Sequence, residues 1–121
     1  MLSAGAQSEP TVLRLWEKEN VRILTVEGPL TINCLFGFQD AWRGESAPAL
    51  VFDLSAVPYA DSAAIGSIVN AFVSRQRAGR LMSLVARERV RAVMKITKVE
   101  SLFPIFDTVE EAVASAKEHL L

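Results

Sequence analysis

A short apolar run in the middle of the chain, Ala49-Leu50-Val51-Phe52, limits the possible folds more than any other segment. It leads into Asp53-Leu54-Ser55, and apolar and polar residues do not alternate within it, as is typical of a strand covered on both faces. Pro58 cannot continue such a strand. The sequence therefore predicts a buried strand over 49–54 in a largely parallel sheet.

A helix is predicted shortly after this strand. From Ile65 the apolar residues recur at helical spacing, and Gly79 stands where a left-handed C-cap would end the helix, so we expect a helix over 62–78. Either Asp61 or Ser62 would be its N-cap. The unpaired N–H groups and the positive end of the helix dipole would favour a negative charge on Ser62 Oγ.

The remaining elements alternate between strands and helices. Two early strands, over 12–16 and 21–27, are joined by a polar turn and should pair as an antiparallel hairpin. Later elements are a helix capped by Asn33, a strand over 81–86, a helix with Val90, Val93 and Met94 inward, a short strand at 105–106, and a closing helix with Thr108 and Glu111 as capping box. This order favours an α/β fold with a mixed, mostly parallel sheet and flanking helices. We expect burial of Leu54, Ile68, Phe72, Leu84 and Val93.

Length and composition indicate one domain. A chain of 121 residues with 50% hydrophobic content can bury a core without disulfides or metal, so we expect a domain over 11–121 after a flexible arm at 1–10. A net charge of −1 gives no overall attraction to nucleic acid or to an anionic membrane. The segment before Pro10 lacks signal-peptide features, and no apolar run matches a bilayer span. We expect a cytoplasmic protein without membrane insertion.

Catalytic and metal chemistry have little support in this sequence. Cys34 is the single cysteine and His119 the single histidine, so no disulfide, thiolate cluster or Ser–His pair is indicated. No glycine-rich phosphate loop is present either. We predict no enzymatic activity, no cofactor and no metal, and interpret Cys34 as a buried, inert thiol. The basic run from Arg75 to Lys98 is interpreted as a solvated face, with a surface for an anionic partner as the alternative. Nucleic acid is not indicated as that partner, since no aromatic residues are interleaved for base stacking.

At the strand–turn–helix segment the chain resembles the STAS family, the domain shared by anti-sigma factor antagonists and the cytoplasmic tails of sulphate transporters. Family members carry a strand ending in Asp-Leu-Ser, then Asp-Ser followed by a small residue, Gly and Leu. The matching residues are Asp53-Leu54-Ser55 and Asp61-Ser62-Ala63-Ala64-Ile65-Gly66, with Ala64 and Ile65 in place of Gly and Leu. The stretch 87–106 also looks like the family's third helix and last strand, so the resemblance covers nearly the whole chain and implies one STAS domain.

The resemblance also implies a function. In the antagonist branch, the serine that matches Ser62 is phosphorylated by a partner anti-sigma factor kinase. The implied module binds an anti-sigma factor while unphosphorylated, which frees a sigma factor, and dissociates once phosphorylated. On this reading the partner-binding residues are Asp61, Ser62, Ala63 and Ala64, with Thr31 and Asn33 in the neighbouring loop.

Other interpretations stay open. From the residues alone, Ser62 is explained as an N-cap, and Thr31 and Asn33 as turn and cap residues. The loop Gly28-Pro29-Leu30-Thr31 lacks the acidic pair of many antagonists, which favours a phosphorylation-independent STAS scaffold or a transporter-associated interaction module. A third hypothesis is a receiver-like domain with Asp53 as phosphoacceptor. It is the weakest, because the nearest acids after the first strand lie in a turn rather than in a metal-binding cluster.

Overall fold

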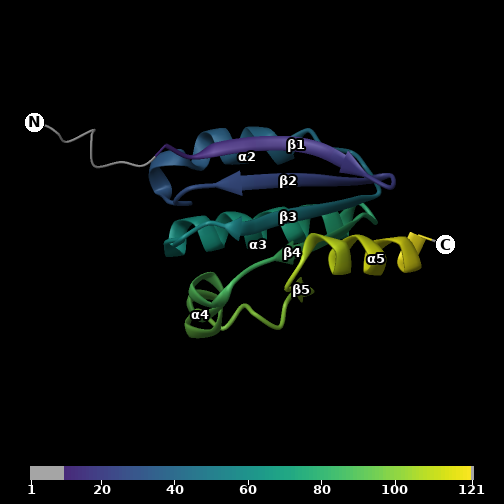
Figure 1. Ribbon diagram of the computed structural model, residues 1–121. Coiled ribbons are helices and arrows are strands. Elements are labelled where there is room, and N and C mark those ends of the chain that lie inside the picture. Colours follow the sequence, from purple (N-terminus) through teal and green to yellow (C-terminus); the bar gives the residue numbers. More distant parts are fainter. Residues whose placement is uncertain (1–9, 121) are drawn as a thin grey trace, which may run out of the picture.

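The computed structural model describes residues 10–120 (Figure 1). The chain forms a five-stranded sheet with helices on both faces. The expected arm lies outside the described residues except for Pro10. The elements in chain order are β1 (Val12–Lys18), β2 (Val21–Glu27), the 3-10 turn η1 (Ile32–Cys34), α2 (Leu35–Arg43), β3 (Ala49–Ala56), α3 (Ser62–Arg77), β4 (Leu81–Val85), α4 (Glu88–Ile96), β5 (Ile105–Phe106) and α5 (Val109–Leu120).

The strands lie in the order β1-β2-β3-β4-β5. β1 pairs antiparallel with β2, and every later pair is parallel, which confirms the predicted α/β fold and its N-terminal hairpin. The hairpin is tight because Glu19 and Asn20 both adopt positive φ, at 52° and 70°, which suits the twist of the two strands. Because β2 and β3 are parallel, their carboxyl ends lie next to each other at the same end of the sheet (Figure 1).

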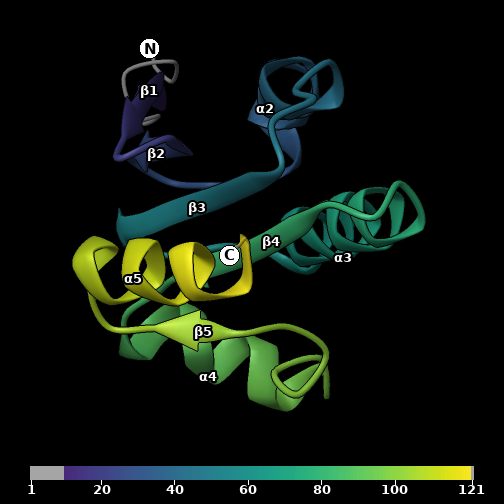
Figure 2. The ribbon, with the colours of Figure 1, turned by 90° about the vertical axis from the view of Figure 1, so that its right-hand side faces the viewer.

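The central strand β3 is buried on both faces, as predicted. Leu50, Phe52 and Leu54 belong to the core under α2, α3 and α4, whereas Ala49 and Val51 belong to the core under α5. Figure 2 shows α5 on one side of the sheet and α2 and α3 on the other. Six consecutive buried residues, 49–54, therefore reflect the two helical layers and not a lack of pattern.

Two details of the sequence prediction are wrong. Leu54, Ile68 and Leu84 are buried, but Phe72 and Val93 are only half-buried. Phe72 lies at the rim of the core, where its ring meets Phe103 edge-on with 5.4 Å between centroids. Asn33 does not cap the following helix, because it lies inside η1, which has Thr31 as its N-cap and passes directly into α2.

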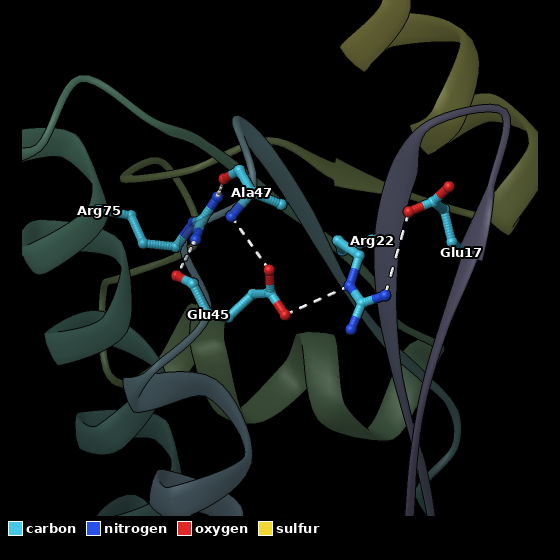
Figure 3. Close-up of polar contacts among 5 residues, drawn as sticks. All are labelled: Glu17, Arg22, Glu45, Ala47 and Arg75. Atoms are coloured by element: carbon cyan, nitrogen blue, oxygen red, sulfur yellow. Dashed lines mark hydrogen bonds and ion pairs between the residues drawn. The ribbon is translucent and has the colours of Figure 1, made fainter.

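A buried arginine, Arg75, stabilises the end of the sheet at which β3 and β4 begin (Figure 3). The side chain of Arg75 is buried, and it donates hydrogen bonds to the carbonyl oxygens of Glu45 (3.1 Å), Ala47 (2.6 Å) and Leu81 (3.1 Å). Glu45 in turn accepts from the Ala47 N–H and pairs with Arg22. Burial lowers the pKa of Arg75, since desolvation disfavours the charged form. The prediction of a solvated basic face is therefore wrong for Arg75.

Within residues 10–120, no helix has the length and apolar character that crossing a membrane would require.

Candidate functional site

Two loops lie side by side at the carboxyl ends of β2 and β3. One runs from the end of β2 to η1, and the other from the end of β3 to α3. The Leu30 N–H donates to the carbonyl oxygen of Tyr59 (3.1 Å), and the Asp61 N–H donates to the carbonyl oxygen of Leu30 (3.2 Å). These bonds form a parallel bridge between Leu30 and Ala60, which brings the start of α3 next to η1.

Asp61 joins the two loops through its side chain. Its Oδ1 accepts the N–H of Ala64 at 2.9 Å, and its Oδ2 accepts the N–H of Ile32 at 2.9 Å. The backbone of Asp61 is extended, with φ −91° and ψ 175°, as an N-cap requires. Of the two candidates for the cap of α3, the structure therefore selects Asp61, and the same carboxylate holds η1 in place.

Ser62 is the first residue of α3 and is exposed. Its hydroxyl forms no hydrogen bond with any residue from 10 to 120, and Asp61 performs the capping. A phosphate on Ser62 Oγ would lie at the positive end of a long helix, where negative charge is favoured locally. The local chemistry is compatible with modification of this hydroxyl, and no bond in the described part of the chain must break first.

Thr31 and Asn33 lie in the adjacent loop, as the sequence predicted. Thr31 is half-buried, and its Oγ1 accepts the N–H of Asn33 at 3.4 Å. Asn33 is exposed. The half-buried Cys34 thiol donates to the carbonyl oxygens of Thr31 (3.2 Å) and Pro29 (3.6 Å), so its contacts are structural. The loop thus presents Asn33 to solvent on a turn that Thr31 and Cys34 stabilise.

The two alanines after Ser62 differ in exposure. Ala63 is half-buried, whereas Ala64 is fully buried at 0% exposure. Ala64, which was expected among the partner-binding residues, therefore has no side-chain surface to offer a partner. Its small side chain belongs to the core, and its backbone N–H receives the Asp61 cap.

Exposed apolar side chains lie in the two bridged loops and at the start of α2, and the sequence did not predict their exposure. Phe36 is 85% exposed, Ile32 64% and Tyr59 50%. Ile32 and Tyr59 lie in the two bridged loops, and Phe36 lies in the first turn of α2. The sequence could have indicated the exposure of Phe36. Phe38 and Trp42 lie on the buried face of α2, and Phe36 does not share their helical spacing. Large exposed apolar groups gathered at one end of a domain are typical of an interaction surface.

Asp53 is not available as a phosphoacceptor. It is 8% exposed, and its carboxylate accepts hydrogen bonds from Ser55 Oγ (2.7 Å) and Thr25 Oγ1 (3.3 Å). Glu17 and Glu19 lie at the hairpin, at the opposite end of β2 from Thr25. No group of acids, cysteines and histidines in the described chain could hold a metal ion. The receiver hypothesis is therefore wrong.

Comparison with known proteins agrees with this geometry. A family model described as the STAS domain matches residues 13–112. This chain belongs to the STAS family. The match extends from β1 to the first turn of α5 and includes both bridged loops.

Solved structures place this STAS domain close to bacterial anti-sigma factor antagonists in fold. An anti-sigma factor antagonist from Mycobacterium paratuberculosis has a TM-score of 0.84 at 22% identity, covering 91% of this chain and 98% of that one. The antagonist SpoIIAA in its unphosphorylated form has a TM-score of 0.72 at 13% identity, covering 88% and 97%. A sulfate transporter family protein from Wolinella succinogenes has a TM-score of 0.75 at 16% identity, covering 85% and 89%.

Proposed function

We propose that this STAS domain is an anti-sigma factor antagonist that binds an anti-sigma factor kinase and dissociates once Ser62 is phosphorylated. One observation carries the proposal: Ser62 is exposed at the first position of α3, while the neighbouring Asp61 caps the helix. The hydroxyl is accessible to a kinase and has no structural duty among the described residues. The partner surface comprises the exposed parts of the bridged loops and the start of α3, including Thr31, Asn33, Asp61, Ser62 and Ala63.

The switch would act on the interface and not on the fold. Phosphate adds roughly −1.5 to −2 charges at neutral pH. At the N-terminus of α3 this charge is compatible with the helix dipole. In a complex, however, it would lie beside Ile32, Phe36 and Tyr59, which a partner would cover and dehydrate. Burying a charge without a counter-ion opposes binding strongly, so phosphorylation favours dissociation.

The module has a binding role only, with no turnover, cofactor or metal of its own. Its partner is a protein and not nucleic acid, and it acts in the cytoplasm. The relatives support the regulatory reading, because two are named anti-sigma factor antagonists and one is described in an unphosphorylated form. The fold alone does not decide this, and the exposed serine supplies the specific argument.

Binding by Ser62 variants tests the proposal. Proteins captured by the wild-type domain from its source cells are identified, and affinity for the purified anti-sigma factor is then measured by calorimetry. Ser62→Ala should bind like the wild type, whereas Ser62→Asp should bind at least about tenfold more weakly, roughly 1.4 kcal/mol. Ser74→Asp, on an exposed serine near the far end of α3, is the matched control and should leave the affinity unchanged. Equal affinity of Ser62→Asp and wild type would contradict the switch.

A second function is favoured by the loop before η1. Pro29 and Leu30 are buried there, in the loop where many antagonists carry acids. The domain would then be a phosphorylation-independent scaffold or a transporter-associated module, consistent with the sulfate transporter relative. Failure of a bound kinase to incorporate phosphate, together with binding that ignores Ser62→Asp, would favour this function.

A further inference from the structure

The outer edge of β1, the side away from β2, is the longer of the two open edges of the described sheet. β1 pairs only with β2 among residues 10–120, over seven consecutive residue pairs without a break in register (Figure 1). β5, at the other end of the strand order, has only two residues. Natural proteins protect edge strands with proline, bulges, short length or charged side chains, and β1 has only the last of these. An edge of this kind can accept a further strand.

The geometry of the hairpin determines which backbone groups of β1 point outward. Lys18 and Val21 flank the two-residue turn, so they face each other as a hydrogen-bonded pair. Bonded and non-bonded pairs alternate along an antiparallel ladder. The N–H and C=O groups of residues 13, 15 and 17 are therefore directed to the outer edge. Outside the strand ladders, no backbone hydrogen bond of residues 10–120 uses these groups.

The side chains along this edge are apolar and incompletely covered. Leu15 is 39% exposed, although it lies opposite Leu24 of the buried core. Leu13 shares this face and is half-buried against the same core. On the other face Trp16 is half-buried, and the Arg14 guanidinium carbon lies 5.5 Å from the centroid of its ring. A strand added at this edge would cover Leu15 and Trp16 and would extend the apolar layers on both faces.

The charges of β1 favour one register for pairing with a second copy of the chain. In a two-fold antiparallel pair, opposite residues share a face of the sheet, so the residue on the axis determines every other pair. An axis at Arg14 would place two arginines opposite each other. An axis at Trp16 would place Arg14 opposite Lys18, and like charges in opposite positions are destabilising. An axis at Leu15 pairs all seven residues of β1 without such a conflict, and registers further out pair fewer residues.

We propose that this domain forms a two-fold dimer in which the β1 strands of two copies pair antiparallel with Leu15 on the axis. Arg14 of one copy then lies opposite Trp16 of the other, where a guanidinium can stack on the indole ring. Leu13 of one copy lies opposite Glu17 of the other, so the two sheets become one continuous sheet. The proposal does not depend on the proposed function, because neither a kinase nor a phosphate takes part in it.

The position of α2 is compatible with this pairing. α2 approaches the first half of β1, since a Cβ at Gly37 would lie 3.8 Å from Leu13 Cδ1. A two-fold axis at Leu15 therefore places the two α2 helices over opposite halves of the strand pair.

Light scattering and sedimentation of the full chain over a range of concentrations test the dimer. The mass should rise to twice that of one chain. Leu15→Lys should weaken dimerisation at least about tenfold, because two lysines would face each other on the axis. Val73→Lys, on a valine of α3 that is 37% exposed, is the matched control and should keep the dimer. Circular dichroism establishes that each variant is folded.

Cysteine cross-linking tests the register and does not require an intact dimer to be disrupted. Leu15→Cys in a Cys34→Ser background should form an intermolecular disulfide on mild oxidation, since the axis brings the two Cα atoms within the roughly 7 Å that a disulfide allows. Glu17→Cys in the same background is the control. The axis separates its two copies by four residues along the strands, about 13 Å, so it should stay reduced.

Three results would overturn the inference. The first is a monomeric mass at every concentration that the protein tolerates. The second is a dimer that the folded Leu15→Lys variant leaves intact. The third is a disulfide that forms as fast at Glu17→Cys as at Leu15→Cys, since the strands would then pair in another register or not at all.

Discussion

At the scale of single residues, the structure identifies Asp61 as the cap of α3, whereas the sequence could not choose between Asp61 and Ser62. Either residue could cap a helix, and the choice depends on the loop that Asp61 also bonds. That loop follows β2, so the Asp61 bond to the Ile32 N–H joins residues distant in sequence. Local pattern could predict that a cap exists here, but the second bond arises only from the parallel pairing of β2 and β3.

Replacing Asp61 by Ala should therefore destabilise the domain more than replacing Ser62. Asp61→Ala loses the α3 cap and the bond to η1, for an expected cost of about 1–3 kcal/mol. Ser62→Ala removes an exposed hydroxyl and should stay within about 0.5 kcal/mol. Urea unfolding of both variants checks this. A Ser62→Ala protein that loses as much stability as Asp61→Ala would show that Ser62 is the true cap.

Arg75 is the residue that sequence reasoning placed most wrongly. Its acceptors lie in the α2–β3 loop and at the start of β4, and nothing in the local sequence of α3 indicates that they surround it. Its neighbour in the basic run, Arg77, is exposed as expected.

Substitution of Arg75 should be costly for that reason. Arg75→Leu leaves three backbone carbonyls without their donor, and we expect a loss of about 2–4 kcal/mol. Arg77→Leu is the matched control and should change stability by less than about 0.5 kcal/mol. Chemical denaturation of the two variants measures their free energies of unfolding. Equal stabilities would contradict the stabilising role of the Arg75 hydrogen bonds.

At the scale of elements, the predicted strands and helices are all present, with ends shifted by one or two residues at most. Their periodicity is local, so a single sequence suffices to recognise them. The start of α2, the helix expected to be capped by Asn33, is the exception. A turn of η1 precedes α2 there, because Asp61 and Thr31 hold the loop in a tighter conformation than a simple Asn cap would.

Two glycines in these elements should respond to alanine with opposite signs. Gly28 ends β2 with φ +101°, and a Cβ there would come within 2.5 Å of the Pro10 carbonyl oxygen, so Gly28→Ala should cost about 1–3 kcal/mol. Gly66 lies inside α3 with open space around it, so Gly66→Ala should stabilise by about 0.5–1 kcal/mol. Thermal melts measure both, and a Gly28→Ala domain as stable as the wild type would contradict the account of this turn.

At the scale of the whole molecule, the two ends of the sheet have different roles. Arg75 stabilises the end at which the parallel strands begin, whereas the opposite end carries Ser62 and the two bridged loops. The sequence predicted the fold, because a family pattern marks it, and the proposed switch at Ser62 rests on the same pattern. It did not predict the exposed Phe36 and Ile32, since exposure depends on how the helices pack.

Acid should weaken the contacts between α5 and the hairpin. The hydrogen bond and charge of Lys117 lower the pKa of Glu19, and a backbone hydrogen bond and Lys18 lower that of Glu110, each below the ordinary 4.5. Depressed carboxylate pKa values stabilise the fold above the unfolded-state pKa, and this contribution is lost as the pH falls through the folded-state values. Lys117→Gln should show a smaller drop in denaturation midpoint between pH 7 and pH 3 than the wild type. An identical drop would contradict this coupling.

Phosphate mapping after reaction with the bound anti-sigma factor kinase and ATP tests the central claim most directly. Mass spectrometry of the purified domain should find one phosphate, on Ser62, and none on Ser62→Ala, and the modified domain should no longer co-elute with its partner. Phosphate on another residue, no phosphate at all, or a phosphorylated domain that still binds its partner would contradict the account.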